Sequence, residues 1–228
     1  MDKVYSLSSG ELQLAMPGSG VTTYYSADMS RDDVDVVQRW MTSALPADSS
    51  YNTRIFKSVD GTLQLRVAAA DARDGGKHSF EGRQIHLVYG DPAFAPFLKA
   101  AAAHIDAAKA HAANENQIEM LSKYYEHFRS GDIALHKASQ EAWVRDQGPA
   151  VECNLGFIES YRDPVGVRGE WEGFVAVVNR CWRRSPICSF HFVHAVNRKM
   201  SEKFGGLVDA AKSLLAQVLV CFSLVSAI

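Results

Sequence analysis

Residues 148–179 read GPAVECNLGFIESYRDPVGVRGEWEGFVAVVN, and this stretch determines more of the interpretation than any other part of the chain. Gly148-Pro149 interrupts the helical sequence before it, and residues 151–161 return to the apolar and aromatic composition of a strand. The glycines that follow stand in no GxGxxG or P-loop pattern. We therefore expect them at turns and bulges rather than around a phosphate group.

Charged residues alternate in sign through the second half of the same stretch. Such a pattern can order the wall of a binding cleft, or it can be a solvated network of ion pairs. We favour the structural interpretation, in which the charges pair with one another. The residues concerned are Glu159, Arg162, Asp163, Arg168, Glu170 and Glu172.

The sequence before residue 90 predicts mostly short strands. Ser30 is a candidate N-cap for one helix over residues 31–43, with acidic residues in its first turn. Asp60-Gly61 is a strong hairpin signal between two strand candidates. We expect a polar loop over residues 71–79, which contain Gly75-Gly76. The expected strands are residues 21–25, 53–59, 62–68 and 84–89.

Helical sequence dominates the middle of the chain. Residues 96–113 are rich in alanine, the strongest helix former. Residues 117–129 place apolar side chains at three- and four-residue spacing, and residues 133–145 follow a candidate cap at Asp132. Together the elements predict an α+β chain, with short antiparallel strands of a partial β-barrel lobe and several helices.

Composition excludes some classes of partner. The 228 residues include 24 Lys and Arg and 26 Asp and Glu, a net charge of -2, so no basic field exists to attract nucleic acid or a membrane surface. The cysteines at 153, 181, 188 and 221 follow no disulfide or CxxC spacing. Residues 1–20 lack the apolar segment of a signal peptide. These features indicate a cytoplasmic protein with reduced thiols.

The stretch over residues 148–179 resembles the signature block of the dipeptidyl peptidase III family. Further matches to that family lie in the same order at residues 20–26, 51–57, 112–114 and 200–204, and at His136-Lys137 followed by Trp143. The resemblance implies a two-lobed zinc exopeptidase that removes dipeptides from the free N-terminus of short peptides. It implies that residues 1–179 form part of the lower lobe, a β-barrel with helices, and that residues 198–217 begin the helical upper lobe.

The resemblance also assigns roles to residues on the expected strand. Glu152 stands where the family has a glutamate that binds the α-ammonium group of the peptide, through a charge-assisted hydrogen bond. Asn154 stands where the family has a tyrosine that steadies the scissile carbonyl. Asparagine can donate a hydrogen bond but has a shorter reach. Glu152 and Asn154 are the expected substrate-binding residues.

The zinc motif of the family is missing from this sequence. The family binds zinc with a His-Glu-x-x-x-His helix and a downstream glutamate, whereas no histidine here is followed by glutamate. We therefore expect no zinc bound by this chain, no catalytic residue in it, and no activity of the chain alone. An alternative is a non-catalytic module that binds peptides or another partner.

Two segments do not follow the family pattern. Residues 180–197 interrupt it, and we interpret about 181–195 as a translated retained intron. Residues 218–228 form an apolar tail that we interpret as similar read-through. A second alternative function, a small zinc-binding protein, depends on the same insert. Its ligands would be Cys181, Cys188, His191 and His194.

Overall fold

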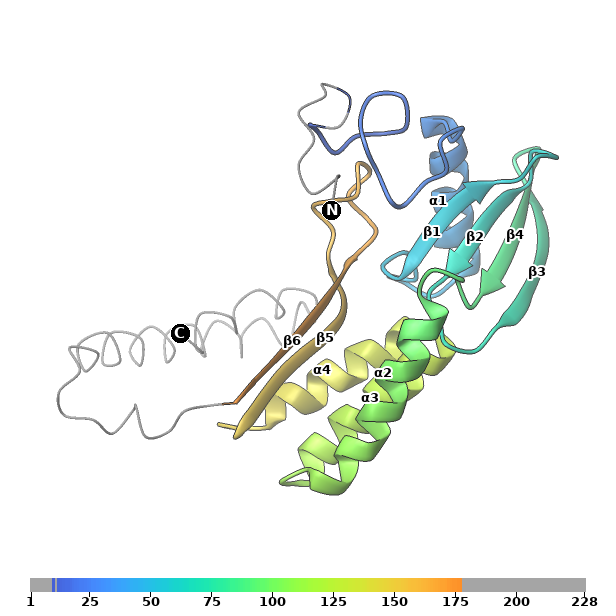
Figure 1. Ribbon diagram of the computed structural model, residues 1–228. Helices are drawn as coiled ribbons and strands as arrows, with labels where there is room; N and C mark the ends of the chain where they lie inside the picture. Colours follow the sequence, from blue (N-terminus) through green and yellow to red (C-terminus); the bar gives the residue numbers. More distant parts are fainter. Residues whose placement is uncertain (1–9, 11, 178–228) are drawn as a thin grey trace. The chain divides into compact units, whose positions relative to one another are not determined.

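A computed structural model of the chain describes residue 10 and residues 12–177 (Figure 1). These residues belong to two compact units. The first is built from residues 1–147 and 154–173, and the second from residues 148–153 and 174–228. In the second unit, the structure describes residues 148–153 and 174–177. Residues 180–197, 198–217 and 218–228, including the four residues of the alternative zinc site, lie outside the described part.

Helix α1, Arg31–Ala44, begins at the predicted cap. The Ser30 hydroxyl accepts a hydrogen bond from the backbone N–H of Asp33 at 3.1 Å, and the Asp33 carboxylate accepts one from the backbone N–H of Ser30 at 3.2 Å. This reciprocal pair is a capping box, which satisfies two backbone donors at the start of the helix. Trp40 and Val37 on its buried face contribute to the core of the first unit.

The main sheet has four strands in the order β1-β2-β4-β3. β1 and β2 are antiparallel and flank Asp60-Gly61, where Gly61 has a φ of 84°, so the predicted turn is confirmed. β2 and β4 are parallel, and β3 returns antiparallel to β4. Among the described strands the sheet stays open and closes no barrel. Their bounds are Thr53–Lys57 for β1, Leu63–Val67 for β2, Arg73–Phe80 for β3 and Arg83–Tyr89 for β4.

Two expectations in this region were wrong. Residues 71–79 were expected to form a loop, but most of them belong to β3, an edge strand whose register shifts between Asp74 and Gly76. Among the described strands, β3 pairs with β4 alone, and its two glycines and polar side chains lower its strand propensity, so the sequence did not predict it. Residues 21–25, expected as a strand, make isolated bridges, including one from Tyr25 to Ile55.

Three helices follow the sheet, as predicted. They are α2 at Ala95–Ala108, α3 at Glu115–Ser130 and α4 at Ile133–Arg145, with the short 3-10 helix η2 at Lys109–His111 after α2. α3 packs against both α2 and α4 (Figure 1). No helix in the described part of the chain is long and apolar enough to cross a bilayer.

Strands β5, Val151–Glu159, and β6, Glu170–Val177, form a separate two-stranded sheet. The sequence predicted β5 but not β6, because Glu170, Glu172 and Gly173 reduce the strand propensity of β6. Within the described residues the chain is α+β, with four α-helices and two sheets of short strands, as expected. Both expected substrate-binding residues lie on β5.

Candidate functional site

Glu152 lies near the start of β5, in the second unit, and is partly buried. Its neighbour Cys153 is buried, and burial, followed by the negative charge of Glu152, raises the pKa of the Cys153 thiol to about 11. A thiol with so high a pKa stays protonated at neutral pH and is a poor nucleophile.

Asn154 lies two residues further along β5, in the first unit, and is partly buried. Its Oδ1 atom accepts a long hydrogen bond of 3.5 Å from the hydroxyl of Tyr124 on α3. The same hydroxyl accepts hydrogen bonds from Nε2 of Gln140 at 2.7 Å and from the backbone N–H of Leu155 at 3.3 Å. The three- and four-residue spacing of apolar side chains in this helix predicted a packed face and gave no sign of this polar contact.

The backbone of β5 is irregular directly after Asn154. Burial along the strand does not alternate there, because Gly156 and Phe157 are both buried. Gly156 has a φ of 148°, and a Cβ atom at this position would lie 2.8 Å from Cε1 of His136. The glycine thus allows β5 to lie directly against the imidazole on α4, as a strand glycine at a close approach does.

Two buried histidines pack together beneath this part of β5. The rings of His127 and His136 lie 5.3 Å apart between centroids, and Nδ1 of His127 donates to the carbonyl oxygen of Asp132 at 2.8 Å. Burial lowers the pKa of His127 to about 4 and that of His136 to about 3. Both imidazoles are therefore neutral at pH 7 and serve packing.

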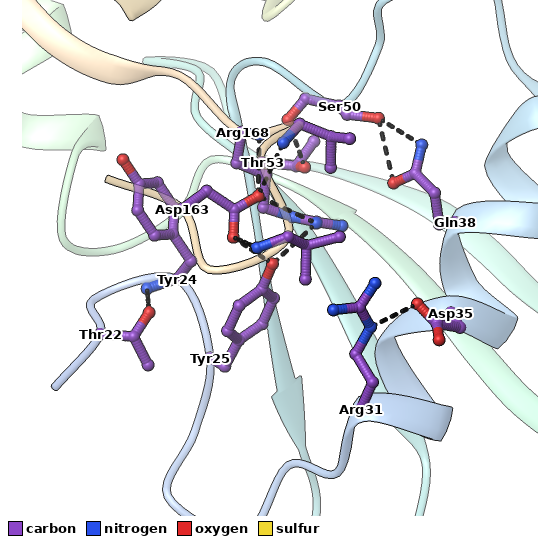
Figure 2. A network of polar contacts seen from close by, with 12 residues as sticks. Thr22, Tyr24, Tyr25, Arg31, Asp35, Gln38, Ser50, Thr53, Asp163 and Arg168 are labelled. Carbon is purple, nitrogen blue, oxygen red and sulfur yellow. Dashed lines mark hydrogen bonds and ion pairs between the residues drawn. The ribbon is translucent and has the colours of Figure 1, made fainter. Parts of the chain in front are cut away.

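The connection between β5 and β6 is held by a buried polar cluster of Tyr25, Asp163 and Arg168 (Figure 2). The Tyr25 hydroxyl donates to Oδ1 of Asp163 at 2.5 Å and accepts from Nη1 of Arg168 at 3.1 Å. The Asp163 carboxylate also accepts hydrogen bonds from the backbone N–H groups of Val165, Val167 and Arg168. Asp163 and Arg168 thus pair with each other as expected, but they are buried core residues, so the expectation of a solvated network was wrong for them.

The other charged residues of the connection lie nearer to solvent. Arg162 pairs with Glu170 at 2.6 Å, with about half of the Arg162 side chain exposed. Burial raises the pKa of Glu172, and the charges of Glu159 and Glu170 raise it further. The charges of three carboxylates, Glu159, Glu170 and Glu172, thus act on one another in this part of the chain.

A cavity of about 200 Å³ lies in the first unit beside these residues. Its lining includes Arg54, Arg162, Phe157 and Trp171. Both guanidinium groups are already paired, since Arg54 makes a bidentate contact with buried Asp91 at 2.6 and 2.7 Å, and Arg162 contacts Glu170. The cavity can hold a small group, but its charges are balanced within the fold.

The described residues do not fit a zinc ion. Within residues 12–177, no three side chains of His, Cys, Asp or Glu come together in a way that could hold a metal. The two buried histidines lie together without a carboxylate or thiolate beside them that completes a ligand set. No reaction step can therefore be assigned to a metal held by this part of the chain.

Comparison with known proteins confirms the resemblance inferred from the sequence. The model of peptidase family M49 matches residues 1–185. Dipeptidyl peptidase 3 of Dictyostelium discoideum is 41% identical over 216 residues, and that of Homo sapiens is 37% identical over 229 residues. Each alignment covers 94% of this chain and 28% of the relative. The solved structure of DPP III from Caldithrix abyssi is 20% identical, covering 85% of this chain and 29% of that chain with a TM-score of 0.48.

The chain therefore spans a little over a quarter of the length of the curated relatives it matches, and the matched region includes both expected substrate-binding residues. The family model extends over most of the 228 residues, and the relatives align in both of the described units. The chain belongs to peptidase family M49.

Proposed function

We propose that this chain is part of a zinc-dependent dipeptidyl peptidase and supplies one side of its peptide-binding site. The observation that carries the proposal is the match to family M49 over residues 1–185, which contain β5 with Glu152 and Asn154. The substrate class is short peptides with a free N-terminus. The relatives named dipeptidyl peptidase 3 support that choice.

In this proposal Glu152 binds the α-ammonium group of the peptide. A carboxylate and an ammonium group form a charge-assisted hydrogen bond, about twice as strong as a neutral one. Asn154 donates an N–H of its amide to a backbone carbonyl oxygen of the same peptide. An amide donor polarises that carbonyl less than a charged group does, so its role is to hold the peptide in position.

Hydrolysis needs a metal-bound water and a base, and we propose that this chain supplies neither. Its sequence contains no His-Glu-x-x-x-His motif, and its described residues do not fit zinc. The chain alone is then a binding partner for peptides without peptidase activity. We also propose the cytoplasm as its compartment, since Cys153 is a free, buried thiol and the other cysteines follow no disulfide spacing.

Calorimetric titration of the purified chain with tetra-alanine tests the peptide-binding role. We expect binding that weakens at least about tenfold when the peptide is N-acetylated or when Glu152→Gln is introduced, the loss of one charge-assisted contact. Glu115→Gln, at an exposed position in the first turn of α3, is the matched control and should bind like the natural chain. Equal affinity for free and acetylated peptide would refute the assignment of Glu152.

A second candidate function is a peptide-binding module that never takes part in hydrolysis. The absence of the zinc motif from the sequence favours it. The two candidates differ in whether the chain can form part of an active peptidase when zinc is present. Tetra-alanine is therefore incubated with zinc chloride and one of two proteins. The first is the chain alone, and the second is the chain joined to the remainder of a family relative. Release of dialanine by the joined protein alone supports the peptidase proposal, and its absence favours the module.

A further inference from the structure

We propose that the cavity of the first unit binds a small, neutral aromatic molecule that carries one hydroxyl group. The lining of the cavity contains neither Glu152 nor Asn154, so the proposal does not depend on whether the chain binds peptides. The cavity has a volume of about 200 Å³. An apolar cavity of about 150 Å³ can hold a benzene molecule, so this one has room for a ring with a few further atoms.

Aromatic side chains form much of the cavity wall. Phe94, Phe157 and Trp171 line it and meet one another in sequence. The ring centroids of Phe94 and Phe157 lie 5.2 Å apart with an angle of 81° between the planes, and those of Phe157 and Trp171 lie 5.2 Å apart with an angle of 69°. Edge-to-face contacts of this kind are favourable for aromatic rings, and a further ring in the cavity can make the same contacts. The wall therefore favours an aromatic ligand.

The two arginines of the lining each have a carboxylate partner. Arg54 donates to the carboxylate of buried Asp91 from Nε at 2.7 Å and from Nη2 at 2.6 Å. Nη1 of Arg162 donates to Oε1 of Glu170 at 2.6 Å. An anionic ligand would have to displace one of these carboxylates, and a cationic ligand would lie against two guanidinium groups. The charges of the lining therefore favour a neutral ligand.

Tyr24 supplies a polar group that the fold leaves for a ligand. The residue is buried and lines the cavity, and its hydroxyl bonds to none of the described side chains. Figure 2 shows this hydroxyl pointing away from the cluster of Tyr25, Asp163 and Arg168. A phenol can donate one hydrogen bond and accept others. A hydroxyl group on the ligand is therefore complementary to it in either direction.

The electrostatic potential at the Tyr24 hydroxyl supports the same choice of ligand. Burial raises the pKa of Tyr24 to about 12, and the negative charges of Glu170 and Asp163 add to the effect. The positive charge of Arg162 opposes them but has a smaller effect than either. The hydroxyl is therefore protonated at neutral pH, and the negative potential around it disfavours an anionic ligand.

The test titrates p-cresol, toluene and benzoate into the ¹⁵N-labelled chain. The readout is the indole N–H signal of Trp171, which is assigned as the signal lost in Trp171→Phe. We expect p-cresol to shift it saturably with a Kd on the order of 1 mM, toluene to bind about three- to tenfold more weakly, and benzoate to cause no shift. The indole signal of Trp40, which packs against His78, should stay in place. No saturable shift with p-cresol, or an equal shift at Trp40, would overturn the proposal.

Tyr24→Phe tests the hydrogen bond to the ligand. This variant should bind p-cresol about three- to tenfold more weakly and toluene as the natural chain does, because only the hydroxyl is lost. Tyr51→Phe is the matched control, since Tyr51 lies next to Asn52 of the lining but does not line the cavity itself, and it should leave both affinities unchanged. An equal loss for p-cresol and toluene in Tyr24→Phe would refute the assigned bond.

Glu170→Gln tests the preference for a neutral ligand. The change removes the carboxylate partner of Arg162 and a negative charge near Tyr24. Benzoate should then bind at least about tenfold more tightly than to the natural chain, through a charge-assisted bond. Glu119→Gln, which breaks the similarly exposed pair with Arg145, is the control and should leave benzoate without effect. Benzoate that binds the natural chain as tightly as p-cresol, or that gains nothing in Glu170→Gln, would contradict the role of these charges.

Discussion

The hydroxyl of Tyr25 donates a 2.5 Å hydrogen bond to the carboxylate of Asp163, which lies 138 residues later in the chain. Arg168 completes the cluster from the same connection, with its guanidinium carbon 5.3 Å from the centre of the Tyr25 ring. All three residues are buried. The contact ties the segment before α1 to the connection between β5 and β6, two parts of the chain that share no secondary-structure ladder.

Replacing Tyr25 with phenylalanine should therefore destabilise the fold. Tyr25→Phe removes one hydrogen bond to Asp163 and one from Arg168 and leaves the partners buried, which costs about 1–3 kcal/mol. Urea unfolding followed by circular dichroism measures the loss. Tyr24→Phe is the control, because the Tyr24 hydroxyl bonds to none of the described side chains, and this change should cost about 0.5 kcal/mol or less. Equal losses for the two variants would contradict the role of the cluster.

Removing the charge of Asp163 should cost more. Asp163→Asn leaves Arg168 as a buried cation without its counter-charge and replaces an acceptor of backbone N–H groups with a donor. Breaking a buried pair in this way costs about 3–5 kcal/mol. Asp35→Asn provides the comparison, since Asp35 pairs with Arg31 on the exposed face of α1 and should contribute about 0.5 kcal/mol or less. The same unfolding measurement ranks the two, and a smaller loss for Asp163→Asn would contradict the prediction.

Local sequence signals predicted the elements but not this cluster. The cap at Ser30, the Asp60-Gly61 turn and the helix at 133–145 each depend on a few neighbouring residues, so the sequence contains all that determines them. The burial of Asp163 and Arg168 depends on Tyr25, which is far away in sequence. An alternating run of charges looks the same whether it is solvated or buried.

The residues of the candidate site also differ in whether the sequence could predict them. Glu152 and Asn154 could be named from the resemblance, because their positions within a recognisable block define them. Tyr124 could not, because its side chain fits the apolar spacing of α3 and its polar partners, Gln140 and Leu155, come from other elements. A buried tyrosine on a helix face usually finds a partner for its hydroxyl, and that is the one signal the sequence offered.

A methyl group at position 156 should not be tolerated. Gly156→Ala places a Cβ atom 2.8 Å from Cε1 and 3.0 Å from Nδ1 of His136, and the residue must also keep a φ of 148°. Overpacking costs about 1–3 kcal/mol, and backbone strain adds to it. Gly173→Ala on β6 is the matched control, since its nearest neighbour outside the adjacent residues would be 3.8 Å away. Thermal unfolding separates them: a drop in Tm for Gly156→Ala alone is expected, and equal Tm values would contradict the close approach to His136.

The buried histidines should make the fold sensitive to acid. Folding lowers the pKa of His127 from 6.5 to about 4 and that of His136 to about 3, so between pH 6.5 and about 4 the unfolded chain binds protons that the folded chain does not. The free energy of unfolding is therefore not reduced by these two histidines above pH 6.5, and it decreases as the pH falls below that value. Well below pH 6.5 each histidine contributes a slope of about 1.4 kcal/mol per pH unit.

Urea unfolding at pH 7.0, 6.0 and 5.0 measures this slope. His136→Gln removes one of the two titrating groups, so we expect a lower stability at pH 7 and a decline toward pH 5 that is shallower by about one proton. The control is His104→Gln, which changes an exposed histidine on α2 and should leave the slope as it is. Asp132 accepts a hydrogen bond from His127 through its backbone carbonyl, and the negative charge of Asp132 also favours protonation of His127, but burial outweighs both effects. A slope that is the same in the natural chain and in His136→Gln would show that acid acts elsewhere in the fold.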